Sequence, residues 1–199
     1  LLWVALRDRA FLLYVVFVLG VGIGIAALYG MAGRFLWPDS VVWANRALCT
    51  GISISGVVGP LFTRAFLDTR RRAPHWDRWL GAVAWLHLGV LALSLFGSIR
   101  LGMQTLSATT LIGCSAMLGC GIACALRGVP GARLFVLAWA VLLLGGALMA
   151  LRNFGLVPTH FGTLYAMQIG SALEMLLLSF ALASRFNQLR REKELAQSE

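Results

Sequence analysis

One carboxyl group lies deep inside an apolar stretch, and the chemistry open to it is proton binding or hydrogen bonding. Glu174 comes 13 residues after Phe161 and 11 residues before Arg185 in the last long apolar stretch. At about 1.5 Å of rise per residue, a helix would place it roughly 16 to 20 Å from either end, near the middle of a bilayer. A charge at that depth costs about 2.5–3.5 kcal/mol on insertion scales. Glu174 must therefore bind a proton or meet a polar partner, and the sequence leaves open whether it switches or only packs.

His87 is the second titratable side chain that lies deep in an apolar stretch. It follows Arg78 by nine residues, which places it roughly 13 Å deep and close to the depth of Glu174. A hydrogen bond between Glu174 and His87 would relieve both buried groups, provided that the two helices are neighbours. The alternative is a histidine that only packs locally. We therefore treat the pair as a hypothesis and both residues as candidate switch positions.

The residues around Glu174 indicate which side of its helix is buried. Positions three, four and seven apart share a helix face. Gly170, Ser171 and Ala181 fall on the Glu174 side and are small, as is typical of helix contacts inside membranes. The opposite side is rich in leucine, which suits lipid. We expect Glu174 to face other helices, and Gln168, Gly170 and Ser171 to belong to the same candidate switch.

The other residues that could carry chemistry give no catalytic or metal-binding pattern. Cys120 and Cys124 share a helix face, but no further ligand completes a metal site, and all four cysteines suit apolar packing. The segment Ser53–Gly56 lacks the leading glycine of a rhomboid-like serine protease motif, and the last apolar stretch has no histidine to act as base. Haem would need opposed histidines at matching depth, and only His87 is deeply placed. We predict no enzyme activity, no metal and no cofactor for this chain.

The composition indicates which elements must position these residues. Hydrophobic residues make up 59% of the 199-residue chain and charged residues 13%, with a mean hydropathy of +0.82. A soluble core of this length cannot hide so much apolar surface, so we predict an all-α, polytopic membrane helix bundle surrounded by a lipid bilayer. Six complete spans are expected, at Ala10–Ala32, Val42–Leu67, Trp79–Gly97, Thr105–Leu126, Leu134–Leu156 and Phe161–Ser184.

The charged residues predict an orientation. The net charge of +9 does not indicate nucleic-acid binding, because Lys and Arg lie in short loops between spans. Thirteen of the 17 fall on the side that holds Arg7, Arg70 and Arg185, and four fall on the other side. The positive-inside rule places the first side in the cytoplasm. We therefore predict a cytoplasmic C-terminus. We read the apolar residues Leu1–Leu6 as the tail of a further span and the chain as a fragment.

Small residues predict where two of the spans pack closely. Gly20 and Gly24 form a G-x-x-x-G pair in the first span, and Gly51, Ser55 and Gly59 continue the spacing in the second. Small side chains at this spacing let two helix backbones approach each other. We expect tight helix packing at these positions.

Both ends of the chain carry a recurring pattern. A turn at Asn153-Phe154-Gly155 precedes Pro158 and the stretch Gln168-x-Gly170-Ser171-x-x-Glu174, and a leucine-rich segment then ends in Ala181-Leu182-Ala183-x-Arg185. The opening Arg7-Asp8-Arg9-Ala10-x-x-x-Tyr14 is similar to a first cytoplasmic turn and second span. In this combination the chain resembles bacterial seven-transmembrane receptors with diverse intracellular signalling modules (7TMR-DISM). The two ends carry the resemblance, and the middle spans are generic.

The resemblance implies that the six spans are the second to seventh of seven, in a bacterial inner membrane. It implies a transmembrane sensor and transducer domain over residues 1–185 and the start of a cytoplasmic signalling helix over residues 186–199. An extracytoplasmic sensing domain would precede the chain, and a cytoplasmic effector such as a diguanylate cyclase or a histidine kinase would follow it. The outer turn would couple to the sensing domain through Arg152, Asn153, Phe154 and Gly155. A homodimer is compatible with this arrangement.

The last span offers a physical route for a signal. From Arg185 it continues into a charged segment with no glycine or proline, so one helix could cross the membrane surface. Phe186, Leu189, Lys193 and Ala196 have a spacing suggestive of a coiled-coil start, with a solvated charged tail as the alternative. The predicted function is signal relay through this helix. A small-solute or ion transporter or channel is the alternative, although no acid-rich pathway or inverted repeat is evident.

Overall fold

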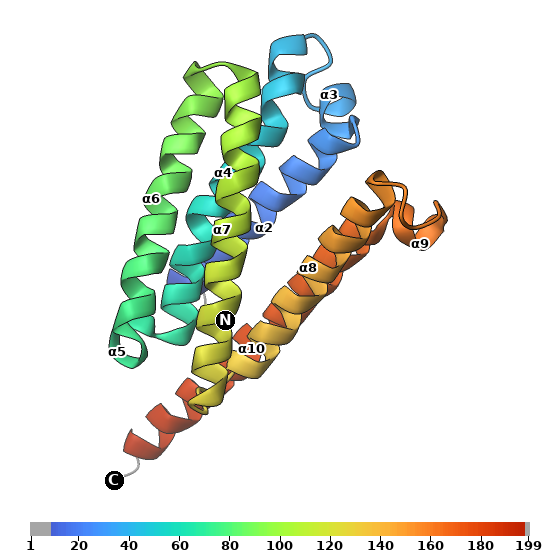
Figure 1. Cartoon of the computed structure of the whole chain (residues 1–199). Helices are drawn as coiled ribbons and strands as arrows, with labels where there is room; N and C mark the ends of the chain where they lie inside the picture. Colours follow the sequence, from blue (N-terminus) through green and yellow to red (C-terminus); the bar gives the residue numbers. More distant parts are fainter. Residues whose placement is uncertain (1–8, 198–199) are drawn as a thin grey trace. The chain divides into compact units, whose positions relative to one another are not determined.

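The structure, a computed structural model, describes residues 9–197, which fold into α-helices joined by short turns (Figure 1). The predicted span remnant at residues 1–6 and the turn at Arg7-Asp8 lie outside the described residues. The helices are α2 (Arg9–Leu28), α3 (Met31–Phe35), α4 (Val41–Leu67), α5 (Thr69–Arg72), α6 (Pro74–Phe96), α7 (Ile99–Leu126), α8 (Ala132–Asn153), α9 (Phe161–Leu164) and α10 (Ala166–Gln197).

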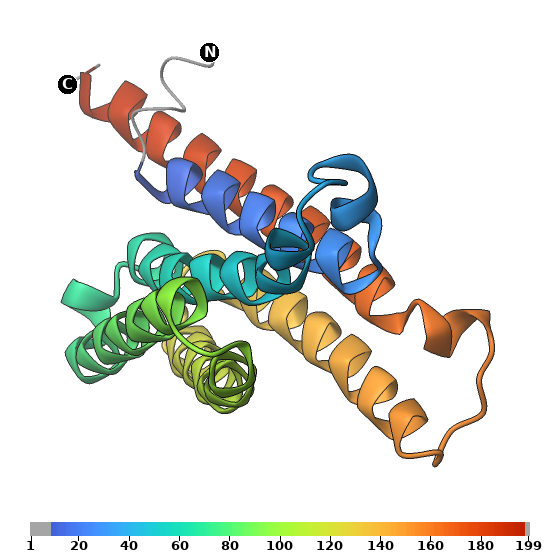
Figure 2. The same cartoon turned by 90° about the horizontal axis from the view of Figure 1, so that it is seen from above.

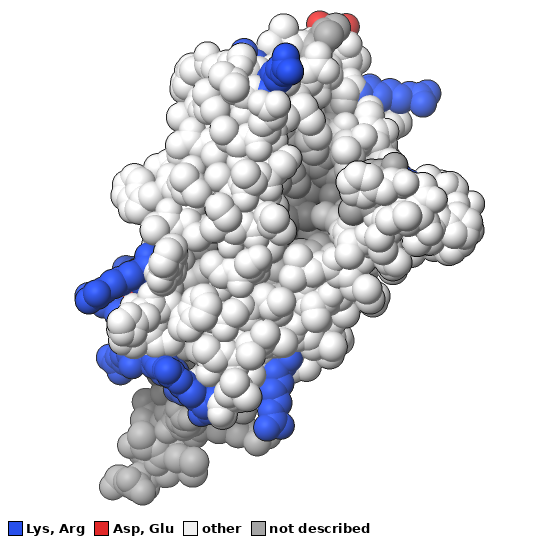
Figure 3. Space-filling view, in the orientation of Figure 1, with Lys and Arg blue, Asp and Glu red and all other residues white. Residues whose placement is uncertain are grey.

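Six of these helices are long and apolar enough to cross a membrane, which confirms the predicted all-α, polytopic architecture. They are α2, α4, α6, α7, α8 and α10. The face drawn in Figure 3 carries its coloured Lys and Arg atoms toward helix ends, whereas the surface along the middle of the helices is uncharged. An uncharged band of this kind suits contact with lipid hydrocarbon, because lipid offers no partner for a charge.

The chain forms two compact units, and the boundary between them lies within α7. The first unit extends to Met117 and contains α2, α4, α6 and most of α7, with α3 and α5 as short connecting helices. The second unit begins at Leu118 and contains the end of α7 together with α8, α9 and α10. Figures 1 and 2 show the helices of each unit from two directions.

Helix α4 is the centre of the first unit, because it packs against both α2 and α6. At its contact with α2, a Cβ atom added to Gly51 would lie 2.8 Å from the Gly20 carbonyl oxygen. A Cβ added to Gly20 would lie 2.5 Å from Ser55 Oγ, and that hydroxyl donates to the Phe17 carbonyl at 3.3 Å. The close packing predicted from the small residues is therefore confirmed. Glycine is required here because two backbones occupy the space of a side chain.

Apolar side chains make further contacts in the first unit. Tyr14 of α2 contacts Phe62 of α4 with ring centroids 5.7 Å apart, and Phe62 stacks on Phe66 at 5.5 Å. Elsewhere in this unit Cys49, Val90 and Leu106 form a buried cluster that joins α4, α6 and α7. Cys49 is a free thiol in this cluster, and the surroundings are those of a packing residue.

The first predicted span is wrong at its end. It was expected to reach Ala32, but α2 ends at Leu28 and the chain turns at Gly30, whose φ is 73°. A residue with a side chain adopts this left-handed conformation at a cost, so glycine permits the break. Hydropathy did not reveal the turn, because apolar residues lie on both sides of it.

Two further helices begin earlier than their predicted spans. Helix α6 begins at Pro74, five residues before the predicted Trp79, because proline is well suited to the first turn of a helix. Helix α7 begins at Ile99, six residues before the predicted Thr105. Both extensions contain polar residues that hydropathy assigns to loops, although nothing prevents such residues from being helical at the edge of a span.

The second unit is organised around a helical hairpin of α8 and α10, which pack against each other. Helix α8 ends at Asn153 rather than at the predicted Leu156. The last predicted span, expected as one helix from Phe161, is divided into α9 and α10 at Tyr165. A capping box begins α9. In it Thr163 N–H donates to His160 Nδ1 at 3.4 Å, and His160 N–H donates to Thr163 Oγ1 at 3.0 Å.

Candidate functional site

Helix α10 carries the candidate switch residues and is a single helix from Ala166 to Gln197. Its sequence is dominated by Ala, Leu, Met, Glu, Lys, Arg and Gln, which favour helix, and it contains no proline. Gly170 is its one glycine. The helix is therefore continuous from Ala166 through the rest of the predicted span and into the charged segment after Arg185. The side chains of Phe186, Leu189, Lys193 and Ala196 lie outside those that the structure describes, so the coiled-coil start stays a prediction.

The glycine of α10 lies at the point where its backbone meets α8. A Cβ atom added to Gly170 would lie 3.2 Å from the Val141 carbonyl oxygen and 3.3 Å from Gly145 Cα. A Cβ added to Gly145 would lie only 2.6 Å from the Ala166 carbonyl oxygen. The crossing is thus a close contact between two backbones, of the kind that small residues permit.

Glu174 follows one helical turn after this crossing and is 0% exposed. Neither of its carboxyl oxygens has a hydrogen-bond partner within residues 9–197. Gly170, Ser171, Leu178 and Ala181 are buried on the same side, as the spacing predicted. Leu173, Leu176 and Phe180, on the leucine-rich side, are exposed to the surroundings.

The polar neighbours of Glu174 on its own helix do not satisfy the carboxyl group. Ser171 Oγ donates to the Gln168 carbonyl oxygen at 3.1 Å, so its proton is used within the helix. Gln168 is half-buried one and a half turns before Glu174. The structure therefore places all four predicted α10 residues on one short segment, but it gives the acid no hydrogen-bond donor there.

His87 belongs to α6 of the first unit and is 2% exposed. Its Nδ1 is 3.0 Å from the Val83 carbonyl oxygen, one turn earlier. The ring lies against Gly56 of α4, where an added Cβ would overlap it, and 3.1 Å from a Cβ added to Gly113 of α7. The imidazole thus fills a space left by two glycines. Its proposed pairing with Glu174 joins the two units and stays a prediction.

The turn before α9, which was expected on the outer side, has a defined geometry. Gly155 has a φ of 73°, its N–H donates to the Arg152 carbonyl at 2.9 Å, and Leu156 N–H donates to the Leu151 carbonyl at 3.0 Å. This pair of bonds is a Schellman motif, which closes α8 with a left-handed glycine. Phe154 is 80% exposed. The side chain of Asn153 is not among those described, and coupling of this turn to another domain stays a prediction.

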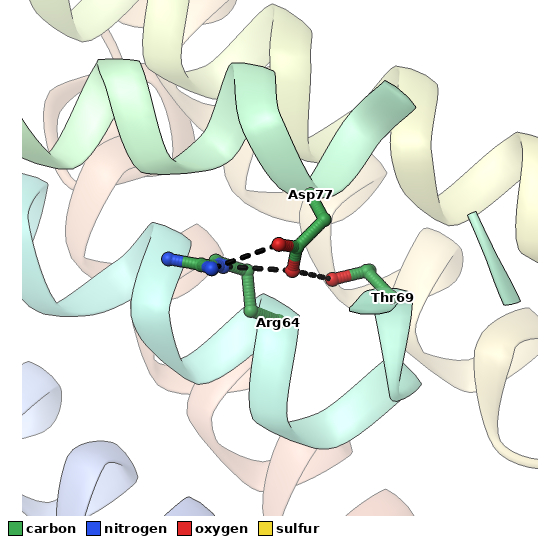
Figure 4. Close-up of polar contacts among 3 residues, drawn as sticks. All are labelled: Arg64, Thr69 and Asp77. Atoms are coloured by element: carbon green, nitrogen blue, oxygen red, sulfur yellow. Dashed lines mark hydrogen bonds and ion pairs between the residues drawn. The ribbon is translucent and has the colours of Figure 1, made fainter. Parts of the chain in front are cut away.

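An ion pair that was not predicted from the sequence joins α4 to α6 (Figure 4). Arg64 Nε and Nη2 donate to Asp77 Oδ1 and Oδ2, each at 2.8 Å, and Thr69 Oγ1 donates to Asp77 Oδ1 at 2.7 Å. We call these three residues the Asp77 cluster. Arg64 was counted only as a charge that orients the protein. The available signal was Asp77 itself, an acid in the first turn after Pro74, where a carboxylate also suits the positive end of the helix.

A second arginine with an overlooked contact is Arg46 of α4. Its Nη1 donates to the Leu95 carbonyl oxygen, and its Nη2 donates to the Gly97 carbonyl oxygen at 3.4 Å. These acceptors lie at the C-terminal end of α6, where carbonyl groups lack partners within the helix. Arg46 therefore joins α4 to the opposite end of α6 from the Asp77 cluster.

The first unit also contains a cavity of about 300 Å³ with an apolar wall. Its lining includes two tryptophans whose ring centroids are 6.5 Å apart, Trp37 and Trp43. The remaining lining residues are Ile23, Ala47, Thr50, Gly51 and Ile54. Such a wall offers hydrocarbon contact and no charged group. Among residues 9–197 no group of three or more His, Cys, Asp or Glu side chains could hold a metal ion.

These observations define a class of protein: a polytopic helical membrane protein whose last helix continues beyond its apolar span. A family model described as 7TM diverse intracellular signalling matches residues 1–185, and the chain belongs to this family. The suspected resemblance is thereby confirmed, and the chain is a transmembrane domain of the signalling kind. No curated protein and no solved structure matches it.

Proposed function

We propose that this chain is the transducing module of a bacterial receptor, and that α10 relays a stimulus from the outer side to an effector in the cytoplasm. The observation that carries the proposal is the continuity of α10 over 32 residues. At about 1.5 Å per residue such a helix is roughly 48 Å long, whereas the hydrocarbon layer is about 30 Å thick. A helix of this length extends beyond the hydrocarbon layer, so movement at one end reaches the other without a flexible joint.

The contact between α10 and α8 supports movement of the last helix. Gly145 and Gly170 let α8 and α10 approach backbone to backbone, and we take this close crossing as the point about which α10 shifts or rotates. We infer that the bundle has two packings of similar free energy and that the stimulus favours one of them. Glu174, buried and without a hydrogen-bond donor in the described chain, sets the balance through a proton or a partner that it gains in one packing.

The proposed arrangement assigns a role to each part of the chain. Residues 1–185 are the membrane transducer and residues 186–199 begin the signalling helix. Arg152, Asn153, Phe154 and Gly155 couple the outer turn to a sensing domain. The excess of basic residues on the other side supports a cytoplasmic C-terminus. Effectors of this class are enzymes such as a diguanylate cyclase or a histidine kinase.

The decisive experiment changes the helical phase between α10 and the effector. One to four alanines are inserted between Arg185 and Phe186 in the intact receptor, and basal effector output is measured. Each residue rotates the helix by about 100°, so insertions of one or two residues should disturb the output and an insertion of four should largely restore it. Effector output that does not depend on the number of inserted residues would contradict relay through α10. Solute flux through liposomes that contain this chain would instead support a transporter.

The orientation is tested separately. A reporter that is active only in the cytoplasm, fused after Gln197, should be active, and the same reporter placed in the turn at Arg34 should be inactive. The reverse result would place the proposed effector on the wrong side of the membrane and would end the receptor proposal.

A further inference from the structure

The connection between α4 and α6 carries more positive charge than its acids balance. Residues 64–78 contain five arginines and two aspartates, Asp68 and Asp77. The two oxygens of Asp77 accept from Arg64 and Thr69, so the Asp77 cluster already uses one of the arginines. Within residues 9–197, the side chains of Arg70, Arg71 and Arg78 make no hydrogen bond, and all three are exposed. We call these three residues the arginine turn.

The arginine turn is held in a fixed position. It occupies α5 and the first turns of α6, and the bidentate contact between Arg64 and Asp77 joins the end of α4 to the start of α6. Thr69 is 0% exposed and Ala73 is 2% exposed, so the backbone of the turn is anchored on its inner side. A group of blue side chains over α5 and the start of α6 is visible in Figure 3. Three guanidinium groups therefore share one surface of a rigid connection.

The position of the turn relative to a bilayer follows from the adjoining spans. Helices α4 and α6 are both membrane-crossing candidates, and the arginine turn joins their adjacent ends. Trp79, the residue after Arg78, is 66% exposed, and Trp76 is half-buried. Indole side chains gather at the level of lipid headgroups, because one edge of the ring is polar and the remainder is apolar. The exposed arginines thus lie where lipid phosphates are within reach.

We infer that the arginine turn is a binding site for the phosphate of an anionic phospholipid. The planar guanidinium fork matches phosphate oxygens, and three exposed forks carry more charge than Asp68 and the partial attraction of Arg70 to Asp77 can neutralise. A zwitterionic lipid offers the same phosphate beside a cation, which the arginines repel. A free phosphate ion lacks acyl chains, which hold the headgroup beside Trp79. The inference is independent of relay through α10.

The binding test uses the full 199-residue chain purified in detergent, with phosphatidylglycerol as the probe and phosphatidylcholine as the zwitterionic control. Lipid retention is measured by native mass spectrometry. Each basic residue near an anionic lipid contributes on the order of a five-fold increase in affinity, so the triple variant Arg70→Gln, Arg71→Gln, Arg78→Gln should bind phosphatidylglycerol roughly a hundred-fold more weakly. Phosphatidylcholine retained as well as phosphatidylglycerol by the native chain would overturn the inference.

A matched variant separates a local site from diffuse charge. The triple variant Arg34→Gln, Arg100→Gln, Arg133→Gln removes the same charge from three exposed arginines elsewhere in the chain. It should retain phosphatidylglycerol to within about two-fold, because a screened charge acts only over about 10 Å. Equal loss in both triple variants would contradict a site at the arginine turn. Displacement of the lipid by millimolar inorganic phosphate would show a free-anion site instead.

Asp77→Asn tests whether the fixed frame matters. This change adds one unit of positive charge but removes the carboxylate that holds Arg64 and Thr69 together. A diffuse electrostatic attraction predicts stronger retention of phosphatidylglycerol, whereas a built site predicts weaker retention, which is the result that we expect. Helix content and gel-filtration behaviour check that each variant is folded, and the charge-conserving variant Arg70→Lys, Arg71→Lys, Arg78→Lys should lose affinity only in part.

Discussion

Gly145 of α8 and Gly170 of α10 bring two helix backbones into direct contact. The Cα atom of Gly145 lies within 3.3 Å of the place where Gly170 would carry a Cβ, and the carbonyl of Val141 lies at 3.2 Å. Such an approach excludes side chains at both positions, because the atoms in the way belong to backbone and cannot rotate aside. Gly170 is the fifth residue of α10, so the helix that we propose as the relay meets α8 backbone to backbone near its N-terminal end.

Substitution of these glycines should destabilise the hairpin in a defined order. Gly145→Ala should cost most, about 1–3 kcal/mol, since its Cβ would meet the Ala166 carbonyl at 2.6 Å. Gly170→Ala, with its nearest atom at 3.2 Å, should cost less. Gly146→Ala is the control, because its Cβ would meet only Met167 Sδ at 3.9 Å. Thermal unfolding of the purified chain measures the order, and an effect of Gly146→Ala as large as that of Gly145→Ala would contradict the contact.

Replacing Glu174 should separate its structural cost from its signalling role. A buried carboxyl without a partner costs about 1–3 kcal/mol, so Glu174→Leu should raise stability by about 1 kcal/mol. Glu174→Gln keeps a buried polar group and should change stability little. Both variants should alter the ligand-dependent output of the intact receptor if the carboxyl proton sets the balance of two packings.

One outcome would contradict the absence of a partner for the Glu174 carboxyl, and another would contradict its signalling role. A large loss of stability in Glu174→Leu would reveal a partner that the carboxyl group already has in the native state. Normal output from both variants, with unchanged dependence on stimulus, would leave Glu174 as a packing residue only. Thermal unfolding and effector activity, measured on the same preparations, distinguish these cases.

The features that could be predicted from the sequence are those that depend on local patterns. Six helices follow from apolar runs, and the buried side of Glu174 follows from small residues three and four positions away. That α2 packs closely on another helix follows from the spacing of Gly20 and Gly24, because small side chains at this spacing let two backbones approach. Each of these inferences needs only the residues of one helix.

The features that were missed depend on residues far apart in the chain. Arg64 and Asp77 meet because α5 reverses the chain between them, and no pattern within either helix indicates their distance. Arg46 binds carbonyl groups at the end of α6, and a backbone acceptor leaves no trace in the sequence. The break at Gly30 was missed because hydropathy does not report φ. The pairing of Glu174 with His87 also depends on the placement of distant helices, and it stays a prediction.

The ion pair of Arg64 and Asp77 should make a measurable but moderate contribution to stability. The Arg64 side chain is 34% exposed, so solvent weakens the attraction, although the bidentate geometry and the Thr69 hydroxyl favour it. A double-mutant cycle with Arg64→Ala and Asp77→Ala should give a coupling of about 1 kcal/mol. The measurement is thermal or denaturant unfolding in detergent, and additive effects of the two changes would mean that the pair is not formed in solution.

The contact of His87 with Gly56 provides a test of how the first unit packs. Gly56→Ala places a methyl group where the imidazole ring lies, so it should destabilise the unit by about 1–3 kcal/mol. His87→Ala leaves a hole and should also destabilise it. In the double variant the methyl group enters part of the space that the ring vacates. The double variant should therefore lose clearly less stability than the sum of the losses in the two single variants. Gly89→Ala, whose Cβ would meet nothing within 4 Å, is the control on the same helix as His87. Strictly additive costs for Gly56→Ala and His87→Ala would show that the ring does not occupy the glycine gap.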